Sequence, residues 1–241
     1  MITLLFDIDD TLYDMMIPFQ SACHAVLGTQ CDAFIEDMFK VFYRHSNRLL
    51  EDTQKGHLPI EIMRQKRIQL AAQEFGLTLS DETASSFQIS YKENQEKIFI
   101  SDTVREMLDD CCHHHAAAGI ITNGPSGHQW QKALWLGLDH WFLREQVIIS
   151  GDVGVDKPHV DIFRHVSEKL QLSGKEVWYV GDTFANDIVG PSQIGWHTIW
   201  LNRRHYPTPE VPPYPDITVK DEEEMCTAIK NLIHECQPNK Q

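Results

Sequence analysis

The stretch LLFDIDDTL, residues 4 to 12, decides how the chain folds and where its polar site is expected. Its apolar half belongs to a run over 2–8 that predicts a buried strand. Three carboxylates, Asp7, Asp9 and Asp10, then fall within four positions. Clustered carboxylates repel one another unless a positive group lies among them. The pattern therefore predicts a strand that ends at a site with a cationic partner.

Further strands are predicted along the chain. They are short apolar runs, and segments with helical spacing, such as 126–137 and 158–171, lie between them. The predicted strands after the first are 118–124, 146–150, 177–182, 196–202 and 217–219, with a final helix over 222–235. Strands that alternate with helices predict an α/β fold, a doubly wound, mostly parallel, Rossmann-like sheet with helices on both faces.

A long helical insertion separates the first predicted strand from the second. About 100 residues between them contain no convincing strand. Helical periodicity covers the ranges 20–55, 59–75 and 81–98. We therefore expect an α-helical domain, residues 15–100, inserted into a core domain made of residues 1–14 and 101–241.

Composition disfavours several classes of partner. The chain has 241 residues, 42% hydrophobic content and a formal net charge of −14, so nucleic acid and anionic membranes would be repelled. No apolar run is long enough for a membrane span or a leader segment. The six cysteines show no C-x-x-C spacing, which predicts reduced thiols. We expect a cytoplasmic protein with no nucleic-acid and no membrane partner.

Reactive side chains follow the predicted strands. In open parallel sheets, ligands bind beyond the carboxyl ends of the strands. Those ends deliver the carboxylates Asp7, Asp9, Asp182 and Asp187, the hydroxyl of Thr122, the amide of Asn123 and the ammonium of Lys157. A hard cation such as Mg²⁺ binds carboxylates of this kind, and Asp7 and Asp182 are its first candidate ligands. Because residues two apart on a strand share a face, Asp7 and Asp9 are expected to point the same way, with Ile8 in the core.

Four motifs together resemble those of the haloacid dehalogenase-like (HAD) hydrolase superfamily. They are DIDDT at 7–11, ITNG at 121–124, Lys157 within DKPH, and GDTFAND at 181–187. The stretch from 122 to 203 is also similar to the subfamily that contains house-cleaning 5'-nucleotidases and N-acylneuraminate-9-phosphate phosphatase. The resemblance implies a HAD core with an α-helical cap, and a Mg²⁺-dependent phosphatase.

The resemblance also implies catalytic roles for individual residues. Asp7 would attack phosphorus and become an aspartyl-phosphate, while Asp9 would protonate the leaving alcohol and then activate water. Thr122 and Lys157 would hold the phosphoryl oxygens. Asn123 is a further candidate for substrate binding, although its simplest role is to shape the loop.

A metal site is implied in the same way. The ligands of Mg²⁺ would be the carboxylate of Asp7, the backbone carbonyl of Asp9, and the carboxylate of Asp182. Asp187 would act through water or by holding the lysine of the third motif. Asp10 lies between motif positions, and we expect it only to cap or solvate the turn.

The inserted helical domain would then be a cap that closes over the site and selects the substrate. Arg64 and Arg67 fall within the apolar stripe of the predicted helix 59–75, where a charged side chain needs a partner. They are candidate substrate-binding residues. The alternative is that they extend to solvent or pair with Glu74.

The expected function is hydrolysis of a small phosphomonoester, either a nucleoside monophosphate or a sugar phosphate. The partner would be a small phosphorylated metabolite, and the protein a monomer or homodimer. One alternative is a phosphomutase of a phosphorylated sugar, which uses the same four motifs. The other is a non-catalytic regulatory module with the same fold, which is disfavoured because every motif residue is present.

Overall fold

The computed structural model describes residues 2–235, which form two compact units. The first consists of Met1–Asp14 and Phe99–Gln241, and the second is the continuous segment Met15–Ile98. No helix within residues 2–235 is long and apolar enough to cross a membrane. The cysteines in this range are free thiols, as predicted. Cys236 lies outside the described residues, as does the end of the core domain that was expected to extend to residue 241.

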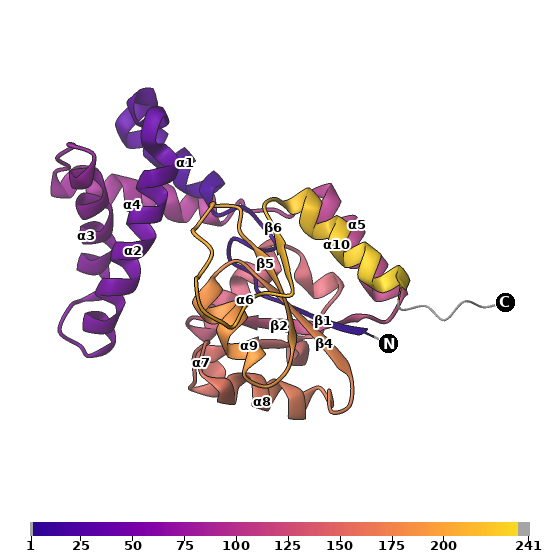
Figure 1. Cartoon of the computed structure of the whole chain (residues 1–241). Coiled ribbons are helices and arrows are strands. Elements are labelled where there is room, and N and C mark those ends of the chain that lie inside the picture. The colour runs from indigo at the N-terminus through magenta and orange to yellow at the C-terminus, as the bar shows by residue number, and fades with distance from the viewer. Residues whose placement is uncertain (1, 236–241) are drawn as a thin grey trace. The chain divides into compact units, whose positions relative to one another are not determined.

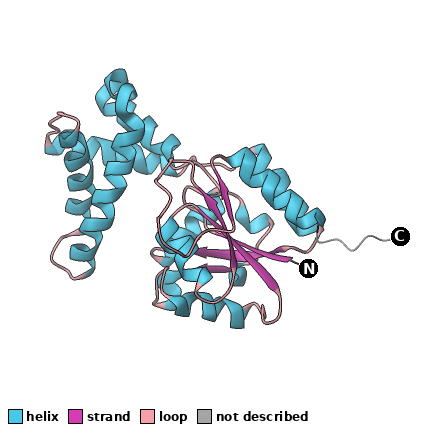
Figure 2. Ribbon diagram, in the orientation of Figure 1, coloured by secondary structure: helices cyan, strands magenta, loops and turns pink. Residues whose placement is uncertain are grey.

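A parallel sheet forms the centre of the first unit (Figure 2). Within residues 2–235 it has six strands in the order β3-β2-β1-β4-β5-β6, and each neighbouring pair is parallel. The strands are β1 (Ile2–Phe6), β2 (Ala117–Thr122), β3 (Val147–Ile149), β4 (Glu176–Gly181), β5 (His197–Leu201) and β6 (Ile217–Val219). The predicted strands and the α/β class are confirmed, although β1 ends two residues earlier than predicted.

The strand order determines where a ligand can bind. The chain runs outward from β1 through β2 to β3, returns past β1 to β4, and then continues outward to β5 and β6. The direction of winding therefore reverses at β1, and the carboxyl ends of β1, β2 and β4 meet there. Such a switch point is the usual ligand site of an open α/β sheet.

Helices cover both faces of the sheet. Figure 1 shows α8 and α9 on one side, with α5 and α10 packed together on the other. Helix α8 contributes Ile162, Phe163 and Val166 to a core that includes Leu5 of β1 and Tyr179 of β4. The helices of this unit are α5 (Asp102–His113), α6 (Ser126–Trp135), α7 (Ser150–Val153), α8 (Val160–Lys169), α9 (Gly190–Ser192) and α10 (Glu222–Glu235).

Aromatic side chains hold the helical unit together. The rings of Phe19, Phe42 and Phe87 are fully buried, with centroids 5.0, 5.8 and 5.8 Å apart. The helices are α1 (Met16–Leu27), α2 (Ile35–Gln54), α3 (Ile60–Glu74) and α4 (Asp81–Gln95). The helical segment predicted over 20–55 is divided, because Gly28 adopts φ +64° and a 3₁₀ segment, Gly28–Phe34, follows it.

Candidate active site

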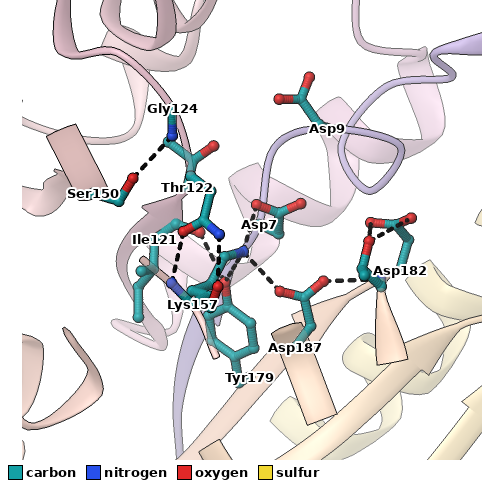
Figure 3. Close-up of polar contacts among 12 residues, drawn as sticks. Asp7, Asp9, Ile121, Thr122, Gly124, Ser150, Lys157, Tyr179, Asp182 and Asp187 are labelled. Atoms are coloured by element: carbon teal, nitrogen blue, oxygen red, sulfur yellow. Dashed lines mark hydrogen bonds and ion pairs between the residues drawn. The ribbon is translucent and has the colours of Figure 1, made fainter. Parts of the chain in front are cut away.

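A buried lysine lies at the centre of the candidate site (Figure 3). The Nζ atom of Lys157 donates to Asp187 Oδ1 at 2.7 Å, to Asp7 Oδ1 at 2.8 Å and to the hydroxyl of Tyr179 at 2.9 Å. Lys157 is only 4% exposed. Burial favours a neutral amine, but the two carboxylates outweigh it and raise the pKa of Lys157 well above its ordinary value. The side chain is therefore a fixed ammonium beside Asp7.

Tyr179 connects this lysine to the sheet. It lies on β4 and is fully buried, and its hydroxyl accepts from Lys157 while donating to the carbonyl of Ile121 on β2 at 2.8 Å. Burial raises the pKa of Tyr179, so the hydroxyl keeps its proton. The hydroxyl thus ties Lys157 to the backbone of β2, which β1 separates from β4 in the sheet.

Three carboxylates meet beyond the ends of β1 and β4. Asp7, Asp182 and Asp187 each offer an oxygen, and these oxygens lie within 4.8 Å of one another. Burial raises the pKa of Asp7 to about 7, against the opposing effect of Lys157 and with repulsion from Asp187 adding to it. Burial and acidic neighbours also raise the pKa of Asp182 well above its ordinary value. The residues fit a hard divalent cation, because oxygen donors and unbalanced negative charge are what such an ion requires.

A glycine lets Asp187 approach the lysine. Gly181 ends β4, and a Cβ atom placed there would lie 2.4 Å from Cγ of Asp187. Asp187 itself lies in the helical turn Phe184–Val189, and its Oδ2 accepts the backbone N–H of Thr183 at 2.9 Å. The carboxylate is therefore held between a backbone donor and Lys157.

The ITNG motif lies at the end of β2. Thr122 is the last residue of the strand and is buried, and its Oγ1 accepts from Nε2 of Gln129 at 2.5 Å, which leaves its own proton for another acceptor. Asn123 receives the backbone N–H of Lys157 at 2.8 Å and donates to the carbonyl of the same residue at 2.9 Å. Asn123 thus shapes the backbone around Lys157, and its contact with a substrate stays a prediction.

The expectation that Asp9 and Asp7 point the same way is wrong. Alternation of side chains applies only within a strand, and β1 ends at Phe6, before either carboxylate. Ile8 is fully buried, as expected. Figure 3 shows the carboxylate of Asp9 apart from the group formed by Asp7 and Lys157.

Asp9 has its own set of donors. Lys132 Nζ lies 2.6 and 2.7 Å from its two oxygens, the hydroxyl of Tyr13 donates at 2.6 Å, and Gln129 Nε2 donates at 3.0 Å. Burial favours protonation, but Lys132 and the hydrogen bonds outweigh it and hold the pKa of Asp9 below its ordinary value. Asp9 is therefore a carboxylate in this arrangement.

Sequence reasoning missed Tyr13, Gln129, Lys132 and Tyr179. A signal for two of them exists within α6. Gln129, Lys132 and Ala133 share one face of that helix, and all three are buried. Polar side chains on the core-facing stripe of an amphipathic helix are unusual and point to a specific partner.

Asp10 is buried, so of the two expected roles, capping or solvating the turn, solvation is wrong. It occupies the turn with φ +58°, and Arg204 donates to it through Nε at 2.9 Å and through Nη2 at 2.5 Å. Arg204 Nη2 also contacts Asp14, the last residue before the helical unit. Asp10 therefore completes the turn by binding a buried arginine.

Arg67 and Arg64 differ within the helical unit. Arg67 is half-buried, with its guanidinium carbon 4.4 Å from the centroid of the Phe42 ring and a hydrogen bond of 3.0 Å to Gln88. Arg64 is exposed, which agrees with the alternative that it extends to solvent. Among the described residues, Glu74 forms ion pairs with Arg44 and His45 of α2, and not with Arg64 or Arg67. A substrate-binding role for Arg64 or Arg67 stays a prediction.

Comparison with known proteins identifies relatives that match all or part of the chain. Two archaeal proteins named glyceraldehyde 3-phosphate phosphatase are among them. The Methanopyrus kandleri protein is 24% identical over 95% of this chain and 97% of its own length. The Methanocaldococcus jannaschii protein is 32% identical over 47% of this chain, and the match spans only about half, 49%, of that relative.

Solved structures share the fold. The HAD-hydrolase YfnB of Bacillus subtilis, in a crystal structure described as bound to magnesium, superposes with a TM-score of 0.66 at 24% identity, covering 95% of this chain and 98% of that one. A family model described as haloacid dehalogenase-like hydrolase matches residues 2–195. Since this match includes all four motifs and most of the chain, the protein belongs to the haloacid dehalogenase-like hydrolase family.

Proposed function

We propose that the protein is a Mg²⁺-dependent phosphatase that hydrolyses a small phosphomonoester through an aspartyl-phosphate on Asp7. The observation that carries the proposal is the setting of Asp7. This carboxylate is buried at the end of β1, 2.8 Å from the ammonium of Lys157 and close to Asp182 and Asp187. A nucleophile at the switch point of the sheet, beside a fixed cation, suits attack on an anionic phosphoryl group.

In the first half of the reaction, an oxygen of Asp7 forms a bond to phosphorus as the bond to the leaving oxygen breaks. Lys157 offsets the negative charge that gathers on the phosphoryl oxygens, and the hydroxyl proton of Thr122 is available to one of them. Asp9, once protonated, gives its proton to the leaving oxygen, which departs as an alcohol.

In the second half, water attacks phosphorus and displaces the carboxylate of Asp7. Asp9, now ionised, accepts a proton from that water, so both aspartates return to their starting states. Phosphate and alcohol are the products, and the proton count balances over the cycle.

A divalent cation would be held by the carboxylates of Asp7 and Asp182 and the backbone carbonyl of Asp9, with Asp187 nearby. The cluster of oxygens within 4.8 Å of one another supports this set. When bound, the ion would supply positive charge that lets Asp7 approach an anionic substrate.

The helical unit Met15–Ile98 is proposed as the cap. Its candidate specificity residues are Arg64 and Arg67, and Arg64 is favoured because it is exposed whereas Arg67 binds Gln88 and stacks on Phe42. The names of the archaeal relatives support a short phosphorylated sugar as the substrate. A nucleoside monophosphate is the second candidate, supported by the sequence similarity over 122–203. The proposed location is the cytoplasm.

A phosphatase screen with the purified protein tests the proposal. We expect phosphate release from triose phosphates or nucleoside monophosphates with Mg²⁺, and loss of activity with EDTA. Asp7→Asn should abolish turnover, whereas the exposed Asp139→Asn, a change of the same kind, should leave it unchanged. Wild-type turnover by Asp7→Asn would rule out the aspartyl-phosphate. Transfer of phosphate to a second sugar position, instead of release, would identify a phosphomutase.

A further inference from the structure

Lys132 is a buried cation that the proposed chemistry does not use. It lies on α6, is 3% exposed, and its Nζ atom lies 2.6 and 2.7 Å from the two oxygens of Asp9. A lysine inside a protein is costly unless a carboxylate pairs with it. The fold therefore places this ammonium against one particular carboxylate, that of the proposed general acid and base.

The other described partners of the Asp9 carboxylate are also donors. The Tyr13 hydroxyl donates at 2.6 Å and the side-chain amide of Gln129 at 3.0 Å. Donors from three side chains fix the orientation of the carboxylate that they share. Figure 3 shows the carboxylate of Asp9 apart from the group formed by Asp7 and Lys157, so these donors, and not Lys157, hold it.

We infer that Lys132 is a positioning residue that, together with Tyr13 and Gln129, orients the side chain of Asp9, the proposed general acid and base, in a donor cradle. This rests on the proposed function. The three donors keep this side chain in one orientation for proton transfer to the leaving oxygen, and Lys132 acts only through Asp9.

The cradle is also connected to the phosphoryl site. The same Nε2 atom of Gln129 that reaches Asp9 lies 2.5 Å from Oγ1 of Thr122 at the end of β2. One side chain thus contacts both the general acid and the proposed phosphoryl-binding hydroxyl. This contact fixes the cradle relative to the place where the leaving oxygen must lie.

The test uses two esters of similar shape that differ in their need for an acid. Benzyl phosphate releases a poor leaving group that must be protonated, and p-nitrophenyl phosphate releases a stable anion. Lys132→Met should lower kcat/KM about 10- to 100-fold for benzyl phosphate and no more than about threefold for p-nitrophenyl phosphate. The exposed Lys175→Met is the matched control and should change neither value.

A double-mutant cycle shows whether Lys132 acts through Asp9. In an Asp9→Asn background, adding Lys132→Met should change kcat/KM for benzyl phosphate by less than about twofold, because the group it positions is already lost. Tyr13→Phe removes one donor to Asp9 and leaves the charge of Lys132 in place. It should also lower kcat/KM more for benzyl phosphate than for p-nitrophenyl phosphate, but by a smaller factor. This variant replaces Lys132→Met in the test if Lys132→Met does not fold.

Two results would overturn the inference alone. One is an equal loss for both esters, and the other is a full effect of Lys132→Met in the Asp9→Asn background. Either would assign Lys132 a purely structural role. If the wild-type protein with Mg²⁺ hydrolyses neither ester nor any compound of the phosphatase screen, the proposed function fails and this inference fails with it.

Discussion

At the scale of single residues, the candidate site depends on the hydrogen bonds and ion pairs that hold the buried Lys157. Lys157 is bound by two carboxylates and by the hydroxyl of Tyr179. That hydroxyl also donates to the carbonyl of Ile121. Tyr179 therefore acts on the site by holding Lys157. Removal of its hydroxyl should lower stability more clearly than activity.

Tyr179→Phe should lower the free energy of unfolding by about 1–3 kcal/mol, because the buried carbonyl of Ile121 loses its donor. Activity should fall only severalfold, because both carboxylates still hold Lys157. Urea unfolding and a phosphatase assay measure the two effects. Tyr214→Phe is the matched control, since its hydroxyl also donates to a carbonyl, that of Glu210, but the side chain is exposed. Equal losses of stability in the two variants would contradict the prediction.

The raised pKa of Asp7 predicts how cation binding depends on pH. Its pKa is raised from 3.8 to about 7, so the folded protein binds a proton at Asp7 more tightly than the unfolded chain does. Without a cation, the contribution of Asp7 to stability is therefore fully present below about pH 4 and is lost as the pH rises to about 7. A cation must displace the proton that Asp7 holds at low pH. The stabilisation by Mg²⁺ should therefore grow from about pH 6 to about pH 8.

Thermal unfolding at both pH values, with Mg²⁺ and with NaCl of equal ionic strength as the control, measures this difference. Asp182→Asn should reduce the Mg²⁺-dependent shift in Tm at both pH values, because one proposed ligand is removed. A shift in Tm that is the same at both pH values would show that Asp7 does not exchange a proton for the cation.

Reasoning from strand ends placed most of the candidate site, and its one clear failure has a physical cause. Asp7, Asp182, Asp187 and Lys157 were expected together, and the structure brings them together. The orientation of Asp9 could not be predicted, because the strand stops before the carboxylates and a lysine from a helix more than a hundred residues away determines it.

At the scale of elements, the ends of strands and helices carry the function. The end of β4 requires Gly181, where a Cβ atom would lie 2.4 Å from Cγ of Asp187. Because backbone and side chain are both buried there, the conflict cannot be relieved by a small rotation. Gly181 thus allows β4 and the helical turn Phe184–Val189 to lie close enough for Asp187 to contact Lys157.

Gly181→Ala should therefore displace Asp187 and lower both stability, by about 1–3 kcal/mol, and activity, by about tenfold or more. Gly127→Ala in α6 is the control, because nothing lies within 4 Å of the added carbon and alanine favours a helix. Calorimetry and the phosphatase assay give the two values. Unchanged activity in Gly181→Ala would mean that Asp187 need not keep its position.

Periodicity predicted the strands and most helices because their apolar residues face one core. It did not predict the division of the segment 20–55, since a helical pattern continues on both sides of Gly28 and only the backbone angle there ends α1. For Arg64 it left burial and extension to solvent open, and the structure shows an exposed side chain beside the buried Met63 and Ile68.

At the scale of the whole molecule, the chain leaves the core once and returns once. Asp14 precedes the helical unit, and Phe99 begins the return. The core segments before and after the helical unit both contact the loop that follows β5. Arg204 binds Asp10 and Asp14, and Arg203 lies 3.6 Å from Asp14 and 3.9 Å from Glu222, which accepts a hydrogen bond from Ser101. One pair of arginines thus joins the two segments of the core unit that flank the insertion.

Arg204→Gln should be the most destabilising of these changes, because it removes the charged side chain that donates two hydrogen bonds to the buried Asp10. Loss of one partner of a buried ion pair typically costs about 3–5 kcal/mol, and the deficit should appear as a lower urea midpoint. Arg105→Gln is the control, since its side chain is 53% exposed and its pair with Asp102 is 3.8 Å long. Exposed pairs contribute less than about 1 kcal/mol. If both variants unfolded at the same urea concentration, the ion pair between Arg204 and Asp10 would not contribute to the stability of the turn.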